Sequence, residues 1–183
     1  MSTHRCYSPW LRHLHWLIAL FVTGALVLIE IKGWFPRGSA SRTAVKWGHM
    51  QFGVAVLLLM LPRLFVRLRT EVPPITPPLP RWQAAMSKLV HLVLYVLAFA
   101  LPLLGVAMMF VAGKPWNLLG IPLPVAAVPD GALARQLHDL HETAGNVFLW
   151  VAIAHALAAV FHRYVQRDDT LQRMLPPERG AAR

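Results

Sequence analysis

The sequence has few charged side chains: they make up only 14% of its 183 residues, and only eight residues are acidic. Hydrophobic residues account for 56% of the chain. Water-soluble domains carry about 25% charged residues, so this composition argues against a soluble fold. A hydrocarbon core about 30 Å thick is crossed by roughly 20 apolar residues in a helix. The chain is therefore predicted to be an integral membrane protein with several spans and little left over for a soluble domain.

The sequence also has a single cysteine, Cys6. One cysteine excludes an internal disulfide, a CxxCH haem attachment and an iron–sulfur cluster held by cysteines alone. The net charge of +10 does not predict nucleic-acid binding, because the basic residues lie between the apolar runs and at the two ends. Such a distribution is typical of a membrane protein.

Four apolar runs, at about 13–31, 47–68, 89–111 and 140–165, are each close to one bilayer thickness. They predict an all-α, integral membrane four-helix bundle that forms a single domain over residues 1–183. Lys and Arg occur twelve times on one side, at positions 5, 12, 63, 67, 69, 81, 88, 163, 167, 173, 179 and 183, and six times on the other, at 32, 37, 42, 46, 114 and 135. The positive-inside rule then predicts that both termini are cytoplasmic.

Five of the nine histidines lie within or at the edge of the expected spans, where ionisable side chains are costly and often functional. They are His15, His49, His91, His141 and His155. The 14 residues between His141 and His155 correspond to about 21 Å along a helix and return to within about 40° of the same face. One helix therefore presents an imidazole near each membrane surface, as two stacked haems require.

Each haem needs a second imidazole at matching depth from another helix. His49 is expected to pair with His141 at the outer end, and His15 with His155 at the inner end, with His91 as a rival to His15. Two imidazoles leave the iron without an open position, which suits electron transfer. The alternative is that these histidines form ordinary hydrogen bonds between helices. A zinc site is disfavoured, because no three or four histidines share one depth with metal-ligand spacing.

Four short motifs stand out along the chain. They are His15-Trp16-Leu17, Gly33-Trp34-Phe35-Pro36-Arg37, His138-Asp139-Leu140-His141-Glu142-Thr143 and Asp169-Thr170-Leu171-Gln172-Arg173-Met174-Leu175-Pro176. They resemble motifs of the bacterial cytochrome b561 family. The resemblance covers nearly the whole chain and implies four helices, two haems b, the four ligands named above and a place in the bacterial inner membrane. The similarity around Phe35 and in the C-terminal motif is to members that oxidise superoxide and reduce ubiquinone.

This resemblance leads to a functional hypothesis: a superoxide:ubiquinone oxidoreductase that needs membrane lipid, binds no nucleic acid and requires no obligatory protein partner. Arg37 and Lys114 are expected to steer the superoxide anion to the outer face. His162, His91 and Lys88 are candidate proton donors or ring-oxygen partners for ubiquinone.

Two other hypotheses remain open. The chain could be a haem-carrying electron-transfer and anchor subunit of a larger dehydrogenase or hydrogenase complex, a function also found in the family. It could instead be a haem-free transporter or structural membrane protein, which predicts no absorbance from haem.

Overall fold

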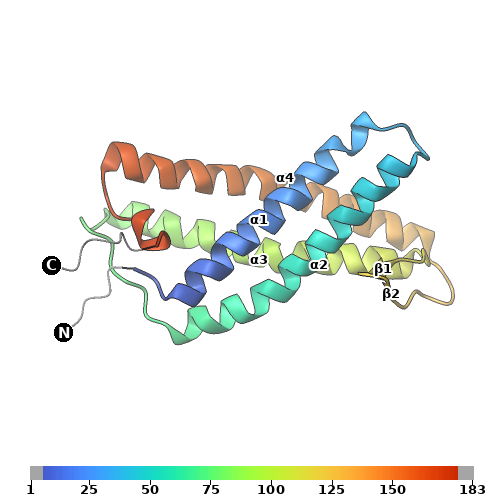
Figure 1. Cartoon of the computed structure of the whole chain (residues 1–183), viewed down its shortest axis with the longest axis horizontal. Coiled ribbons are helices and arrows are strands. Elements are labelled where there is room, and N and C mark those ends of the chain that lie inside the picture. The colour runs from blue at the N-terminus through green and yellow to red at the C-terminus, as the bar shows by residue number, and fades with distance from the viewer. Residues whose placement is uncertain (1–5, 177–183) are drawn as a thin grey trace.

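The computed structural model describes residues 6–176 and contains four long helices (Figure 1). They are α1 (Pro9–Ile31), α2 (Ala40–Arg69), α3 (Arg81–Val111) and α4 (Gly131–Phe161). All four are long and apolar enough to cross a membrane, which confirms the predicted all-α, four-helix membrane fold. At about 1.5 Å per residue, helices of 23 to 31 residues equal or exceed the thickness of the hydrocarbon core.

Polar side chains in the local sequence cap the starts of three of the helices. The side chains of Ser8 and Ser39 accept hydrogen bonds from the first turns of α1 and α2, and Asp130 does so for α4. Such caps satisfy backbone N–H groups that have no partner within the helix. The fourth expected span reached position 165, whereas α4 ends at Phe161 and the chain continues as a π-helical turn, His162–Gln166.

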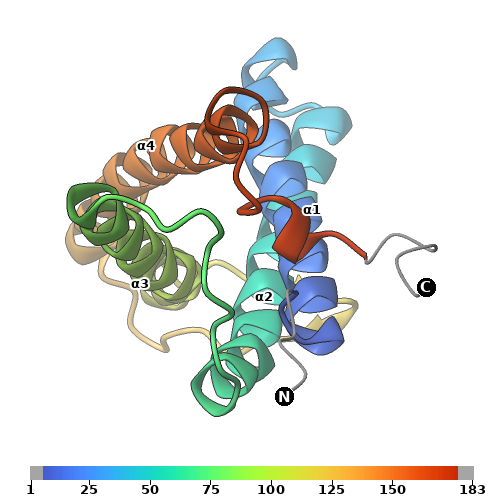
Figure 2. The same cartoon turned by 90° about the vertical axis from the view of Figure 1, so that its left-hand side faces the viewer.

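The bundle consists of two helix pairs, α1 with α2 and α3 with α4, joined mainly by α2 against α3 (Figure 2). Gly24 allows the first pair to approach closely, since a Cβ atom there would lie 2.5 Å from Cε2 of Phe52. The small buried core lies where the pairs meet, and many large apolar side chains elsewhere are exposed, as a lipid-facing surface requires. The core residues are Ile18, Val56, Met60, Ala98, Leu101 and Phe148.

One end of the bundle holds the start of α1, the 70–80 linker and the tail, which we define as residues 167–176; we call it the tail end. Arg173 is buried, donates a hydrogen bond to the carbonyl of Pro73 and lies over the ring of Tyr7. Trp16 on α1 donates to the carbonyl of Met174 at 2.9 Å. The tail therefore ties α1 and the linker to the end of α4.

The opposite end, which we call the hairpin end, carries a minimal hairpin of β1 (Asn117–Leu118) and β2 (Ile121–Pro122). Leu119 and Gly120 turn the chain with φ values of 50° and 89°. The buried side chain of Gln51 on α2 donates to the carbonyl of Asn117 and accepts from the N–H of Leu119. This double contact holds the hairpin against the bundle.

Candidate functional site: two pairs of histidines

His49 on α2 and His141 on α4 face each other near the hairpin end. Their ring centres are 6.2 Å apart and the ring planes are inclined at 85°. They match in depth, since each lies nine or ten residues from the hairpin-end terminus of its helix. Nδ1 of His49 lies 2.9 Å from the carbonyl oxygen of Ala25 and so carries the proton. Its Nε2 atom is then the one available as a ligand.

His15 on α1 and His155 on α4 face each other near the tail end. Their ring centres are 6.4 Å apart and the planes are inclined at 89°. Each lies six residues from the tail-end terminus of its helix, so the two rings match in depth although their distances from the nearest arginines differ. One helix, α4, thus contributes a histidine to both pairs.

His91 on α3 is also close to His155, with ring centres 5.1 Å apart. It lies ten residues into α3 from the tail end, deeper than His15. Its Nδ1 atom is held 2.6 Å from the carbonyl oxygen of Ser87 one turn earlier. The structure therefore brings both candidate partners of His155 to it, at different distances.

These distances test whether the residues fit haem. An imidazole nitrogen binds a first-row metal at about 2 Å, so two imidazoles on opposite sides of one iron have ring centres about 6 Å apart. The separations of 6.2 Å and 6.4 Å match this geometry, and the 5.1 Å between His91 and His155 is shorter. Within residues 6–176, no group of three or more His, Cys, Asp or Glu side chains could hold a metal ion. Paired imidazoles fit a group that supplies the iron's remaining ligands itself.

Space for a flat ligand lies beside the pair at the hairpin end. A cavity there is lined by His49, His141, Gly53 and Gly105, among others. A Cβ atom on Gly53, or on Gly145 one turn after His141, would meet nothing within 4 Å. The glycines one helical turn from each of these histidines thus leave room beside the imidazoles.

Trp116, which the sequence analysis did not assign to the site, also lines this cavity. Its side chain is buried, and no residue in the described part of the chain accepts a hydrogen bond from Nε1. A buried N–H without a partner costs about 1–3 kcal/mol, so this donor suits an oxygen atom of a bound group. Its position directly after Lys114 and Pro115, both in the loop singled out for its charge, was the available signal.

Arg37 and Lys114, the expected steering residues, are both exposed at the hairpin end. In the chain between Cys6 and Pro176 neither forms an ion pair with a carboxylate. Arg42 differs, because its guanidinium donates to the carbonyls of Lys32 and Phe35 and closes the loop. Arg37 and Lys114 therefore keep their positive charge free for an approaching anion.

Of the three residues expected to serve ubiquinone, His162 has the most defined surroundings. Its Nδ1 atom lies 2.5 Å from Oδ2 of Asp168, whose side chain is only 1% exposed. Lys88 is exposed, and no hydrogen bond or ring contact joins His162, His91 and Lys88 in the described chain. The structure therefore leaves these three residues unconnected.

Asp168 is the partner that the sequence analysis missed, and a carboxylate six positions after His162 was the available signal. Burial acts to raise its pKa, but hydrogen bonds from His162 and from the N–H of Thr170 outweigh burial and hold the pKa below the ordinary 3.8. The carboxyl is therefore ionised at neutral pH, beside an imidazole that can carry the balancing proton.

Comparison with known proteins agrees with this architecture. Residues 6–177 match the family model described as prokaryotic cytochrome b561. The chain is 40% identical over 164 residues to cytochrome b561 homolog 1 of Escherichia coli, covering 90% of this chain and 93% of that protein. It is 36% identical over 177 residues to a protein named probable superoxide oxidase CybB in Yersinia pestis, covering 97% of this chain and 99% of that one. Cytochrome b561 homolog 2 of Escherichia coli is 27% identical over 173 residues, covering 88% and 86%.

Proposed function

Because this chain belongs to the prokaryotic cytochrome b561 family and is a bacterial membrane b-type cytochrome, we propose that it holds two haems b and transfers electrons from superoxide to ubiquinone. The observation that carries the proposal is the presence of two imidazole pairs, one toward each end of α4, in a chain of this family.

The two pairs are the proposed haem ligands, His49 with His141 and His15 with His155. Haem b bound at each pair supplies one-electron redox chemistry at its iron. With two histidines holding it, the iron would keep no free position for dioxygen, which suits electron transfer. His141 and His155 are separated by about 21 Å along α4, so the two sites serve opposite sides of the membrane. The splayed helix pairs and the glycines beside the ligands support this assignment.

Superoxide is the proposed electron donor at the hairpin end. Each superoxide anion loses one electron and leaves as dioxygen, so the protein has no bond to break and no proton to move at this step. The protein has only to attract the anion to this end and to keep other molecules away from the site. The unpaired charges of Arg37 and Lys114 support a positive surface that raises the capture rate. The printed name of the Yersinia pestis relative points to the same substrate.

Ubiquinone is the proposed acceptor at the tail end. It takes two electrons, from two superoxide anions, and one proton on each ring oxygen. His162, His91 and Lys88 are the proposed proton donors or ring-oxygen partners, and they lie toward the end where His155 and His15 face each other. Water at the tail end replaces the protons consumed.

We place the tail end in the cytoplasm and the protein in the inner membrane. Within residues 6–176, nine Lys and Arg residues lie toward the tail end and six toward the hairpin end. The sequence adds Arg5, Arg179 and Arg183 to the larger group, and these three lie outside the described residues. The positive-inside rule assigns such a side to the cytoplasm. Superoxide is then collected from the outer face, where the six remaining basic residues lie.

The proposal is tested by mixing purified protein with superoxide in a stopped-flow instrument while haem absorbance is followed. We expect haem reduction faster than superoxide dismutes, followed by reoxidation when a soluble ubiquinone is added. If haem reduction is no faster than spontaneous dismutation, the oxidase proposal fails. Efficient reduction only in the presence of a co-purifying dehydrogenase favours the electron-transfer subunit instead.

A further inference from the structure

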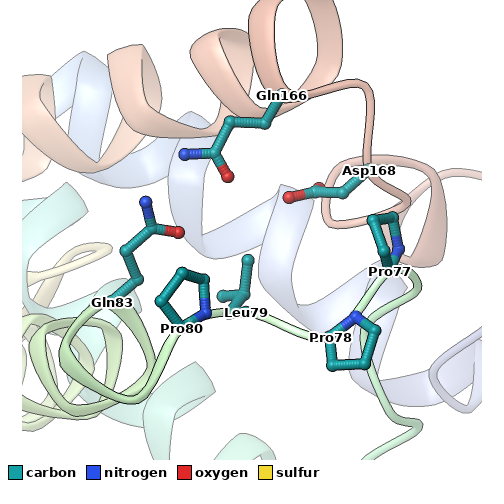
Figure 3. Close-up of a pocket in the computed structure, with 7 residues that line it drawn as sticks. All are labelled: Pro77, Pro78, Leu79, Pro80, Gln83, Gln166 and Asp168. Atoms are coloured by element: carbon teal, nitrogen blue, oxygen red, sulfur yellow. The ribbon is translucent and has the colours of Figure 1, made fainter.

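His162 and Asp168 form a buried contact at the tail end, and this contact lies beside a cavity. The two side chains are 17% and 1% exposed, and 2.5 Å separates Nδ1 from Oδ2. Asp168, Gln166 and Gln83 line a surface cavity together with the proline-rich linker (Figure 3). In this view the carboxylate of Asp168 and the amide of Gln166 both point toward the space above Pro80. The cavity therefore adjoins the pair at Asp168.

The negative charge of Asp168 needs a balancing partner. A buried carboxylate is costly unless a partner neutralises it. Among residues 6–176, His162 is the only basic side chain that forms an ion pair with Asp168. The ionised carboxylate is balanced when the imidazole holds a second proton. When the imidazole holds both protons, Nδ1–H is donated to Asp168 and Nε2–H is free to be given away.

The other charged groups around the pair are engaged elsewhere. Within the tail, Arg173 pairs with Asp169 at 3.5 Å. From α1, Arg12 donates to the carbonyl of Leu175, and on the π-helical turn after α4, Arg163 faces the amide of Gln172. Arg167 is exposed, and α3 presents the uncharged Gln83 to the cavity. In the described chain, Asp168 is thus the charged group in direct contact with His162.

The position of His162 on the chain links the His162–Asp168 pair to the proposed quinone site. His162 follows His155 by seven residues, about two helical turns, which returns it to nearly the same face of α4. It therefore lies about 10 Å from His155 along the helix axis, toward the tail end, and in contact with Asp168, which lines the cavity.

We propose that Asp168 is a positioning residue that fixes the orientation of the His162 imidazole through Nδ1, so that Nε2–H of His162 is the proton donor to a ring oxygen of ubiquinone. This inference rests on the proposed function and deepens its quinone step. The two electrons come from two superoxide anions, which leave as dioxygen, and each ring oxygen gains one proton. Each time His162 gives a proton, the pair regains one from water at the tail end.

The test isolates the quinone step by reducing the haems with dithionite, removing the reductant and mixing the protein with a soluble ubiquinone from pH 6 to pH 9. General-acid catalysis contributes about 10²–10⁴-fold, so we expect Asp168→Asn to slow haem reoxidation about tenfold or more at pH 8. The pH at which the rate has fallen by half moves to lower pH in this variant. Reduction of the haems by superoxide stays as in the unaltered protein.

Two further variants separate proton donation from loosening of the tail. Asp169→Asn removes the same charge one residue away and weakens the contacts of the tail with Arg173 and with the N–H of Thr76. It should leave the pH dependence of reoxidation unchanged. Asp168→Glu retains the carboxylate and should recover most of the rate. Asparagine at 168 can still accept the N–H of Thr170, so the turn itself is preserved.

Three results overturn the inference: reoxidation in Asp168→Asn as fast as in the unaltered protein, the same pH shift in Asp169→Asn, or a rate in the unaltered protein that is flat across this pH range. Each leaves the oxidase proposal standing. If ubiquinone does not oxidise the reduced haems of the unaltered protein at any pH, the quinone half of the proposed function fails together with this inference.

Discussion

His15 and His155 face each other across the tail end with ring centres 6.4 Å apart and planes inclined at 89°, although 140 positions separate them in the chain. His91 approaches the same ring more closely, at 5.1 Å. Because the wider separation is the one that accommodates an iron atom, we take His15 as the ligand and His91 as a neighbour.

This choice predicts different outcomes for two substitutions. His15→Ala should remove the tail-end haem, whereas His91→Ala should retain both haems, since His91 then affects only the surroundings of His155. Haem content per chain is measured by the pyridine haemochromogen assay. Loss of a haem in His91→Ala with retention in His15→Ala reverses the assignment.

The remaining ligands predict a loss that is specific to each site. Alanine at His155 should remove the tail-end haem, and alanine at His49 or His141 should remove the haem at the hairpin end, because one imidazole cannot hold both sides of the iron. Redox titration of each variant should show a single remaining centre. His138→Ala is the matched control, since that side chain is 57% exposed and contacts only neighbouring carboxylates. Retention of both haems in His141→Ala contradicts the assignment.

Gly105 is predicted to protect the hairpin-end site by leaving room for His141. A Cβ atom at this position would already lie 3.4 Å from Cε1 of the imidazole. The branched side chain in Gly105→Leu should displace the ring and reduce haem occupancy at that site, as the absorbance spectrum would show. Gly33→Leu, at a position with nothing within 4 Å of a Cβ, should leave the spectrum unchanged.

Arg37 and Lys114 are predicted to act on the rate of superoxide capture. Reversal of either charge, in Arg37→Glu or Lys114→Glu, should lower the bimolecular rate of haem reduction by about tenfold at low salt, because electrostatic steering changes association rates by about 10–10³-fold. The deficit should shrink as ionic strength rises. Arg135→Glu makes the same charge change at the start of α4 and should have the smaller effect. Equal effects of all three substitutions would mean that net charge alone matters.

Asp168 also predicts a pH dependence of stability. Its pKa in the folded chain lies below the ordinary 3.8, because hydrogen bonds from His162 and Thr170 outweigh the effect of burial. The carboxylate therefore stabilises the fold above that ordinary pKa, and this stability is lost as the pH falls through the lower, folded pKa.

We accordingly expect Asp168→Asn to destabilise the tail by about 1–3 kcal/mol at pH 7, the range for a hydrogen bond to a charged group. The difference from the unaltered protein should shrink once the pH falls below about 4. Hydrogen exchange of tail amides across this pH range measures it. Asp139→Asn, which removes a carboxylate that is 80% exposed, should change little.

The tail illustrates why part of the candidate site could not be predicted. The sequence analysis recognised the motif that begins at Asp169, but the buried partner of His162 is Asp168, one residue earlier. Which of two adjacent carboxylates faces inward depends on the left-handed backbone at Arg167, where φ is 57°. In the structure the tail then folds back against α1 and the linker, through contacts between residues far apart in the chain. Likewise, Trp116 turns into the cavity because Gln51 holds the hairpin that follows it.

The sequence by itself determined the properties that depend on distance along one helix. Hydrophobic runs of bilayer length require helices, since backbone groups in lipid must bond within their own segment, and the helical repeat alone sets His141 and His155 on one face about 21 Å apart. Only the tertiary structure decided which histidines meet across helices. The distances from His155 to His15 and to His91 arise from how α1 and α3 pack against their neighbours, and those contacts join side chains far apart in the chain.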